Sequence, residues 1–140
     1  MSIRLSMPAL GAEEATAVAD VLATGYLTQG PRAAEFERGV AAITGSAHAF
    51  ATSSATTGLH LALAALGVGP GDEVVVPDLS FPATPNVVVQ QAATPVLVDV
   101  RTDDFGMDAA ALEAAIGPRT GAIMPVVAFG LSADMDPSNA

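Results

Sequence analysis

Short apolar strands alternate with helical segments of about ten residues, and this alternation constrains the fold more than any other feature of the chain. The clearest strand is Glu73–Pro77, where Val74–Val76 form a continuous apolar run of the kind that a sheet buries on both faces. Further strands are expected over residues 48–52, 95–100 and 121–127, and helices over residues 13–23, 32–44, 56–66, 83–92 and 109–116. The order predicts βαβ units in an α/β fold of three layers, with a mainly parallel sheet and helices on both faces.

Apolar residues at helical spacing predict which side of each early helix is buried. The expected buried residues are Ala15, Val18, Val21 and Leu22 in the first helix, Phe36, Val40 and Ile43 in the second, and Leu59, Leu63 and Leu66 in the third. Pro31 suits the first turn of a helix, Asp108 suits an N-cap, and Gly67 suits a helix end. These signals fix the expected helix boundaries.

Residues 50–63 (FATSSATTGLHLAL) combine the end of an apolar segment, a cluster of hydroxyls and the start of a helix. A turn of small residues at a helix start exposes backbone N–H groups beside the positive end of the helix dipole, an arrangement that suits a phosphate. The alternative is that Ser54 or Thr56 is an ordinary helix cap. The segment therefore indicates either a phosphate site or a simple cap.

Composition excludes several classes of function. The chain has 140 residues, a formal net charge of −10 and no cysteine. The negative charge argues against nucleic acid or an anionic membrane as a partner, and the lack of cysteine excludes disulfides and thiolate metal sites. The two histidines have no paired spacing, so no metal site is predicted. No apolar stretch is long enough to span a membrane and no secretory signal is evident, so a cytoplasmic location is expected.

Several motifs occur in a specific order. They are GYLTQGP at 25–31, LGVGPGDEVVVP at 66–77, SFPATPN at 80–86, ATPVLVDV at 93–100 and PRTGAIMPV at 118–126. In this order and at these spacings, the chain resembles the DegT/DnrJ/EryC1/StrS family of pyridoxal-phosphate (PLP) sugar aminotransferases from about residue 7 to 136. The resemblance implies part of the large domain of the fold type I PLP-dependent transferases.

The resemblance also implies a set of site residues. In that family the phosphate of PLP is bound at the turn that corresponds to Ser54, Ala55 and Thr56. The aromatic ring that stacks on the pyridine of PLP corresponds to Phe81. Tyr26, Leu27 and Thr28 match a segment near the substrate. The alternatives are that Phe81 fills the core and that Tyr26 packs on the surface. Near the last strand, relatives have a histidine and a glutamine where this chain has Val127 and Leu131.

The five basic residues are all arginine, so the chain contains no lysine. A PLP aminotransferase holds its cofactor as a lysine Schiff base, and a guanidinium cannot replace that amine. We therefore expect residues 1–140 to be a single, incomplete N-terminal part of the large domain, with no catalytic residue of its own. Within it, residues 1–31 form a leading helix and active-site segment, and residues 32–140 form βα units.

The family reaction transfers an amino group, commonly from glutamate, to a keto sugar on a nucleotide carrier, in the biosynthesis of amino sugars, polysaccharides and antibiotic sugars. The complete enzyme is expected to be a homodimer. One alternative is a truncated remnant without catalysis that acts only in binding or oligomerisation. Another is a related PLP-dependent sugar dehydratase. An oxidoreductase is disfavoured, because no G-x-G-x-x-G follows any expected strand.

Overall fold

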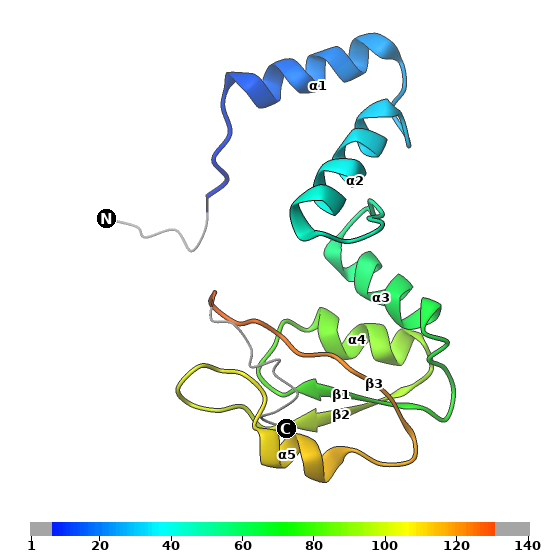
Figure 1. Ribbon diagram of the computed structural model, residues 1–140, viewed down its shortest axis with the longest axis vertical. Coiled ribbons are helices and arrows are strands. Elements are labelled where there is room, and N and C mark those ends of the chain that lie inside the picture. Colours follow the sequence, from blue (N-terminus) through cyan, green and yellow to red (C-terminus); the bar gives the residue numbers. More distant parts are fainter. Residues whose placement is uncertain (1–6, 131–140) are drawn as a thin grey trace. The chain divides into compact units, whose positions relative to one another are not determined.

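The computed structural model describes residues 7–130, which divide into two compact units, unit 1 up to Ala51 and unit 2 from Thr52 onward (Figure 1). Each unit is described by itself below. The expectation of a single domain divided after residue 31 stays a prediction. Among the described residues, no helix has the length and apolar character needed to cross a membrane.

Unit 1 contains two helices, α1 (Ala12–Thr24) and α2 (Pro31–Thr44), close to the ranges expected from the sequence. At the start of α1 the Glu14 carboxylate accepts a hydrogen bond of 2.7 Å from the Gly11 N–H. This bond lowers the pKa of Glu14 below its ordinary value. Pro31 occupies the first turn of α2, as predicted, because its missing N–H would have no partner there.

The prediction that α1 and α2 bury their apolar faces is wrong. No residue between 7 and 51 is buried, and Val18, Leu22, Phe36 and Ile43 are between 60% and 88% exposed. Helical spacing identifies an apolar face, but burial needs a second surface. The described part of unit 1 has no strand and no third helix to supply that surface.

The strand expected over residues 48–52 is also absent, since these residues lie outside every helix and strand. A strand exists only where a neighbouring strand accepts and donates its hydrogen bonds, and the described part of unit 1 contains no such neighbour. Instead the Ala51 N–H donates to Oε1 of Glu37 at 2.8 Å. Residues 48–52 thus have the apolar character of a strand, but the described part of unit 1 lacks the neighbouring strand with which they would pair.

Unit 2 is built around three parallel strands, β1 (Glu73–Pro77), β2 (Thr94–Val98) and β3 (Thr120–Ile123), in the order β2-β1-β3. β1 has the predicted bounds. β2 and β3 end earlier than expected: β2 ends at Val98, and the pairing of β3 ends as the Met124 N–H donates to the Val75 carbonyl at 2.9 Å. The sheet is parallel, as predicted.

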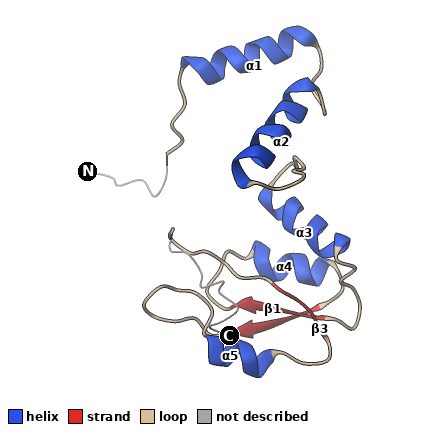
Figure 2. Cartoon of the chain, viewed as in Figure 1, coloured by secondary structure: helices blue, strands red, loops and turns tan. Residues whose placement is uncertain are grey.

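Three helices cover this sheet, α3 (Ala55–Ala65), α4 (Ala83–Gln90) and α5 (Ala109–Ala115). The connection from β1 to β2 and the connection from β2 to β3 run in opposite directions along the sheet. Because such crossovers are right-handed, α4 and α5 must lie on opposite faces, as Figures 1 and 2 show. α3 packs beside α4. The expected three layers are therefore present.

The core of unit 2 lies between β1 and the helices α3 and α4. Val74 and Val76 are fully buried in a cluster with Leu63, Val68, Val87, Val88 and Ala93, while Val75 is fully buried outside this cluster. Each such side chain contributes about 1.5–3 kcal/mol when it is fully buried. Leu59 packs against this cluster, but Leu66 is 71% exposed, contrary to expectation. Leu66 is the C-cap residue, so the chain leaves the helix there and the helical spacing no longer applies.

α3 and α4 end in the same hydrogen-bonded motif with different residues at the left-handed position. After α3, Gly67 has φ 77° and its N–H donates to Ala64, while the Val68 N–H donates to Leu63. This is a Schellman motif, which favours glycine at that position. After α4 the position is held by Ala92 at φ 57°, whose N–H donates to Val89. The second cap therefore carries a backbone cost that the first avoids.

This difference predicts opposite effects of two substitutions. Gly67→Ala should lower the free energy of unfolding by about 0.5–1 kcal/mol, and Ala92→Gly should raise it by a similar amount. A Cβ at Gly67 would meet no atom within 4 Å, so the change tests the backbone alone. Urea unfolding of both variants is the measurement. Two shifts of the same sign would contradict this account of the caps.

Candidate functional site

The carboxyl end of the sheet in unit 2 is where the candidate site lies. All three strands are parallel, so residues 78–82, 99–108 and 124–130 all leave from one edge. The chain leaves β1 toward α4 and leaves β2 toward α5, on opposite faces of the sheet. Such a divergence between neighbouring strands creates the crevice in which α/β proteins bind their ligands.

The N-terminal end of α3 faces the same edge. Residues 66–72 connect the C-terminal end of α3 directly to the amino end of β1, and the Schellman bond from Val68 to Leu63 fixes that turn. α3 also packs along α4, where Nε2 of Gln91 donates to the His60 carbonyl at 3.2 Å. The start of α3 is therefore directed toward the carboxyl ends of the strands.

Four hydroxyl side chains surround the start of α3. The Ser54 Oγ accepts from the Thr57 N–H at 3.1 Å, which makes Ser54 the helix cap. The Thr57 hydroxyl lies 3.0 Å from Ser54 Oγ and 3.2 Å from Ser53 Oγ, and Thr52 Oγ1 donates to the Ser54 carbonyl at 2.9 Å. The capping interpretation is thus confirmed for Ser54, while Thr56 takes no part in the cap.

The same geometry leaves a set of donors unused. The first N–H groups of a helix have no acceptor inside it, and the cap engages only that of Thr57. Within residues 7–130, the N–H groups of Ala55 and Thr56 and the Thr56 hydroxyl have no hydrogen-bond partner. Ala55 is exposed and Thr56 half-buried, at the positive end of the helix dipole. Together they form a donor set of the kind that binds a phosphate.

Phe81 lies just beyond β1 on the same edge, and its side chain is 75% exposed. The alternative that it fills the core is therefore wrong. Its backbone carbonyl accepts from the Thr84 N–H at 3.0 Å, which ties the residue to the first turn of α4. An aromatic ring held at an exposed position beside a buried strand is available to stack on a planar ligand.

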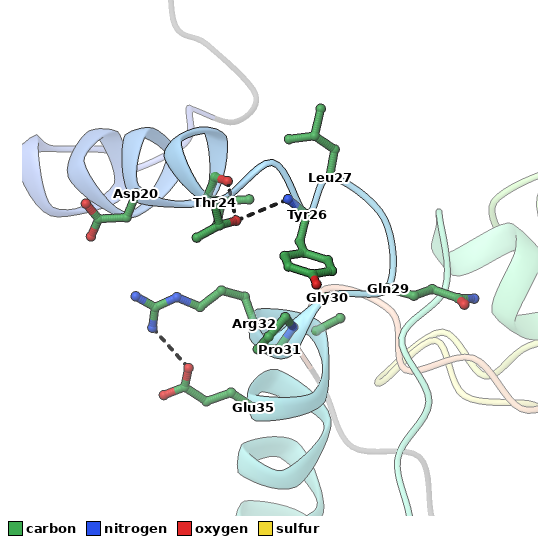
Figure 3. A pocket seen from close by; sticks show the side chains of 11 residues that line it. Asp20, Thr24, Tyr26, Leu27, Gln29, Gly30, Pro31, Arg32 and Glu35 are labelled. Atoms are coloured by element: carbon green, nitrogen blue, oxygen red, sulfur yellow. Dashed lines mark hydrogen bonds and ion pairs between the residues drawn. The ribbon is translucent and has the colours of Figure 1, made fainter.

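Tyr26 and Leu27 belong to unit 1, where they line a pocket of about 420 Å³ (Figure 3). Both side chains are more than 60% exposed, and Thr28 does not line the pocket. A Cβ on Gly30 would lie 3.1 Å from that of Tyr26, a tight contact that glycine avoids. The predicted substrate segment therefore borders a cavity within its own unit, and the structure places only two of its three residues there.

The pocket has charged residues that sequence reasoning missed. Asp20 comes from α1, and Arg32 and Glu35 from the N-terminal part of α2, where an ion pair of 3.0 Å joins them (Figure 3). The available signal was Arg32, one of only five cations, directly after Pro31. In the described part of the chain, no three histidine, aspartate or glutamate side chains gather in a way that would hold a metal ion.

The loop after β2 carries an ionic cluster at the same sheet edge as Phe81. The Arg101 guanidinium pairs with the Asp104 carboxylate, which also accepts from the Gly106 N–H at 2.9 Å. The hydrogen bond from Arg101, followed by that from Gly106, lowers the pKa of Asp104 below its ordinary value. The Asp104 carboxylate therefore stabilises the loop through these two interactions and remains ionised. It is unsuited to act as an acid near neutral pH.

The chain is similar to known proteins both in sequence and in structure. A model of the DegT/DnrJ/EryC1/StrS aminotransferase family matches residues 8–140. Spr1654 from Streptococcus pneumoniae, a protein assigned as a sugar aminotransferase, is 40% identical with a TM-score of 0.92 in both its PMP form and its PLP form. That match covers 96% of this chain and 34% of Spr1654.

Two further solved structures are similar. DesV of S. venezuelae in complex with a ketimine intermediate is 42% identical, with a TM-score of 0.86 over 89% of this chain and 34% of DesV. NtdA from Bacillus subtilis with bound PMP is 36% identical, with a TM-score of 0.85 over 90% of this chain and 30% of NtdA. The chain thus spans about a third of these proteins. The predicted fold class, part of a fold type I large domain, is confirmed.

The effect of Arg101 on the pKa of Asp104 can be tested by titration. Asp104 should titrate below its ordinary pKa in the folded chain, and Arg101→Gln should return it toward that value. Because the folded pKa is lowered, the interaction stabilises the fold above the unfolded pKa, and this is lost as the pH falls through the folded pKa. Carboxyl-detected NMR is the measurement. A titration unchanged by Arg101→Gln would assign the shift to another cause.

Proposed function

Since the chain belongs to the DegT/DnrJ/EryC1/StrS aminotransferase family, we propose that it is the N-terminal part of a PLP-dependent sugar aminotransferase. The observation that carries this proposal is the unused donor set of Ala55 and Thr56 at the carboxyl edge of the sheet. A phosphate needs several donors at one point, and a helix start supplies them without a charged side chain. The family match covers the segment that contains this donor set.

The residues present fit two parts of the cofactor. The N–H groups of Ala55 and Thr56, with the Thr56 hydroxyl, would bind its phosphate, and the exposed ring of Phe81 would stack on its pyridine. When bound, PLP supplies an electron-accepting ring for the transfer of an amino group. The third part, the covalent link, needs a primary amine that none of the 140 side chains offers. This chain is therefore proposed to bind and orient the cofactor rather than to anchor it.

For the substrates, we propose a keto sugar on a nucleotide carrier and glutamate as the amino donor. The support is the resemblance of residues 25–31 to the family segment near the substrate, together with the pocket that Tyr26 and Leu27 border (Figure 3). We propose a homodimer for the complete enzyme, in the cytoplasm, and the large exposed apolar side chains of α1 and α2 are consistent with such an interface.

The second candidate is a remnant that binds without catalysis, and the absence of lysine is the observation that favours it. A longer chain with a lysine after these residues would support the enzyme, whereas a protein that ends at Ala140 would support the remnant. A related PLP-dependent sugar dehydratase would share the same phosphate site, so the donor set does not choose between these two reactions.

Substitutions of two neighbouring hydroxyl residues test the phosphate site. Thr56→Ala should weaken the binding of PLP and of inorganic phosphate by about 1.5–3 kcal/mol, because a hydrogen bond to a charged group is lost. Ser54→Ala is the matched control. It should lower the free energy of unfolding by about 1 kcal/mol through loss of the cap, with a smaller effect on binding. Isothermal titration and urea unfolding measure the two effects.

We expect Thr56→Ala to weaken mainly ligand binding and Ser54→Ala to lower mainly the free energy of unfolding. Equal affinity of Thr56→Ala and the unaltered chain would contradict the assignment of Thr56 to the phosphate. Loss of binding in Ser54→Ala alone would instead make the cap hydroxyl the ligand.

A trapping experiment tests the missing anchor. Borohydride reduction of the chain with PLP should leave no cofactor attached to any internal residue, because no internal primary amine exists. Intact-mass and peptide mass spectrometry measure the attachment. Modification at Met1 would reflect its terminal amine and serves as the internal control for reactive PLP. An adduct at any other residue would show that the chain anchors the cofactor in a different way.

A further inference from the structure

The segment that follows β3 is extended and sparsely held. Its start is fixed where the Met124 N–H donates to the Val75 carbonyl at 2.9 Å. Between residues 125 and 130 there is no hydrogen bond or ion pair to the other described residues. Val126 and Ala128 are half-buried and Val127 is exposed, an alternation typical of an extended chain. This segment, residues 124–130, is here called the strap, and near its far end one aromatic ring meets the loop after β2.

That ring belongs to Phe129, which meets Phe105 from the loop after β2. The ring centroids lie 5.3 Å apart with an interplanar angle of 76°, an edge-to-face arrangement. This is the favoured geometry for an aromatic pair, because the positive edge of one ring meets the negative face of the other. Phe129 is 81% exposed, so the pair lies at the surface and is not a by-product of core packing.

Both phenylalanines have a left-handed backbone, with φ 60° at Phe105 and φ 54° at Phe129. This region is unfavourable for a bulky residue, and a chain adopts it where surrounding interactions compensate. Here the two unfavourable backbones occur at the two residues whose rings touch. At Phe105 the N–H also donates to the Arg101 carbonyl at 3.1 Å, so the ring contact adds to a turn that is already hydrogen-bonded, while at Phe129 no hydrogen bond to the other described residues assists it.

Phe105 is presented from a loop with several internal ties. The Asp108 N–H donates to the Asp99 carbonyl at 2.9 Å and closes the loop, and Val100 and Met107 form an antiparallel bridge inside it. Arg101 and Asp104 pair beneath the turn. The Phe105 ring therefore belongs to a hydrogen-bonded loop, whereas the strap beyond Met124 has no hydrogen bond to the other described residues.

We propose that Phe105 and Phe129 form an aromatic clasp that holds the strap across the carboxyl end of β1. The sheet order is β2-β1-β3, so the loop of one outer strand meets the segment after the other, and the central strand lies between them. In Figure 1 both segments extend past the arrowheads of β1 and β2. Phe105 acts as a positioning residue that sets the path of the strap at the edge that carries Phe81. The clasp rests on the geometry of two side chains of this chain, so it stands independently of the proposed function.

The test uses NMR on the full 140-residue chain with labelled phenylalanine. In the unaltered chain, ring protons of Phe105 and Phe129 should show mutual NOEs and an upfield ring-current shift. Phe105→Leu should abolish that shift and raise the population of the released strap by about 2- to 12-fold, the range that an aromatic pair contributes, seen as lower ¹H–¹⁵N heteronuclear NOEs at residues 126–130. Phe36→Leu is the matched control, since Phe36 is an exposed phenylalanine of unit 1, and it should change neither signal.

The outcomes separate the clasp from general destabilisation. If Phe105→Leu also raises amide exchange at Val74–Val76, the fold itself has weakened, and Phe105→Tyr, which retains the ring, then decides by keeping the Phe129 shift. The double variant Phe105→Leu, Phe129→Leu should lower the heteronuclear NOEs of the strap no further than either single variant. Absence of ring NOEs in the unaltered chain, or strap heteronuclear NOEs unchanged by Phe105→Leu, would overturn the proposal.

Discussion

Burial of the three valines of β1 is the interaction on which the rest of unit 2 depends. All three are fully buried, Val74 and Val76 in one cluster with Val87 and Val88 of α4 and Leu63 of α3, and Val75 outside that cluster. Apolar burial has no direction of its own, but a strand buried on both faces must have a layer on each side and a neighbour on each edge. The parallel pairing of β1 with β2 and β3 meets the second requirement, and the opposite placement of α4 and α5 meets the first.

This arrangement concentrates polar and exposed groups at one edge. Phe81 is 75% exposed only four residues beyond the buried Pro77, because the chain must leave the sheet there to reach α4. The Schellman turn at Gly67 fixes how the chain passes from the end of α3 to β1. It thereby fixes the direction of α3 and the position of its first residues. Helix geometry then leaves the N–H groups of Ala55 and Thr56 without partners among residues 7–130. The proposed phosphate site is thus a consequence of the fold and needs no basic side chain.

The sequence predicted those features that depend on neighbouring residues. β1 was predicted with its observed bounds because consecutive valines suit no other environment, and Asp108 caps α5 as expected, accepting from the Ala111 N–H at 2.8 Å. Features that need a distant surface were not predictable. Ile43 is 88% exposed although its spacing suits a core, and residues 48–51 form no strand because unit 1 offers no partner among its described residues.

The site shows the same limit. The hydroxyl cluster was visible in the sequence, but only the hydrogen bonds separate Ser54, which caps, from Thr56, which does not. Arg32 and Glu35 of α2 line the pocket of unit 1 together with Asp20 of α1. No short sequence motif therefore contains all three residues. The left-handed backbone of Phe105 and Phe129 has no sequence signal, since phenylalanine is not a residue that favours it.

The central claim is that the start of α3 binds the cofactor phosphate through backbone N–H groups. An amide ¹H–¹⁵N NMR titration of the chain with PLP, and in parallel with inorganic phosphate, tests it most directly. The account predicts that the amides of Ala55 and Thr56 shift most, saturate together and respond to both ligands, while the amide of Thr57, already bonded to Ser54, shifts less. Saturable shifts centred on the unit 1 pocket or on α5, with the amides of Ala55 and Thr56 unmoved, would contradict it.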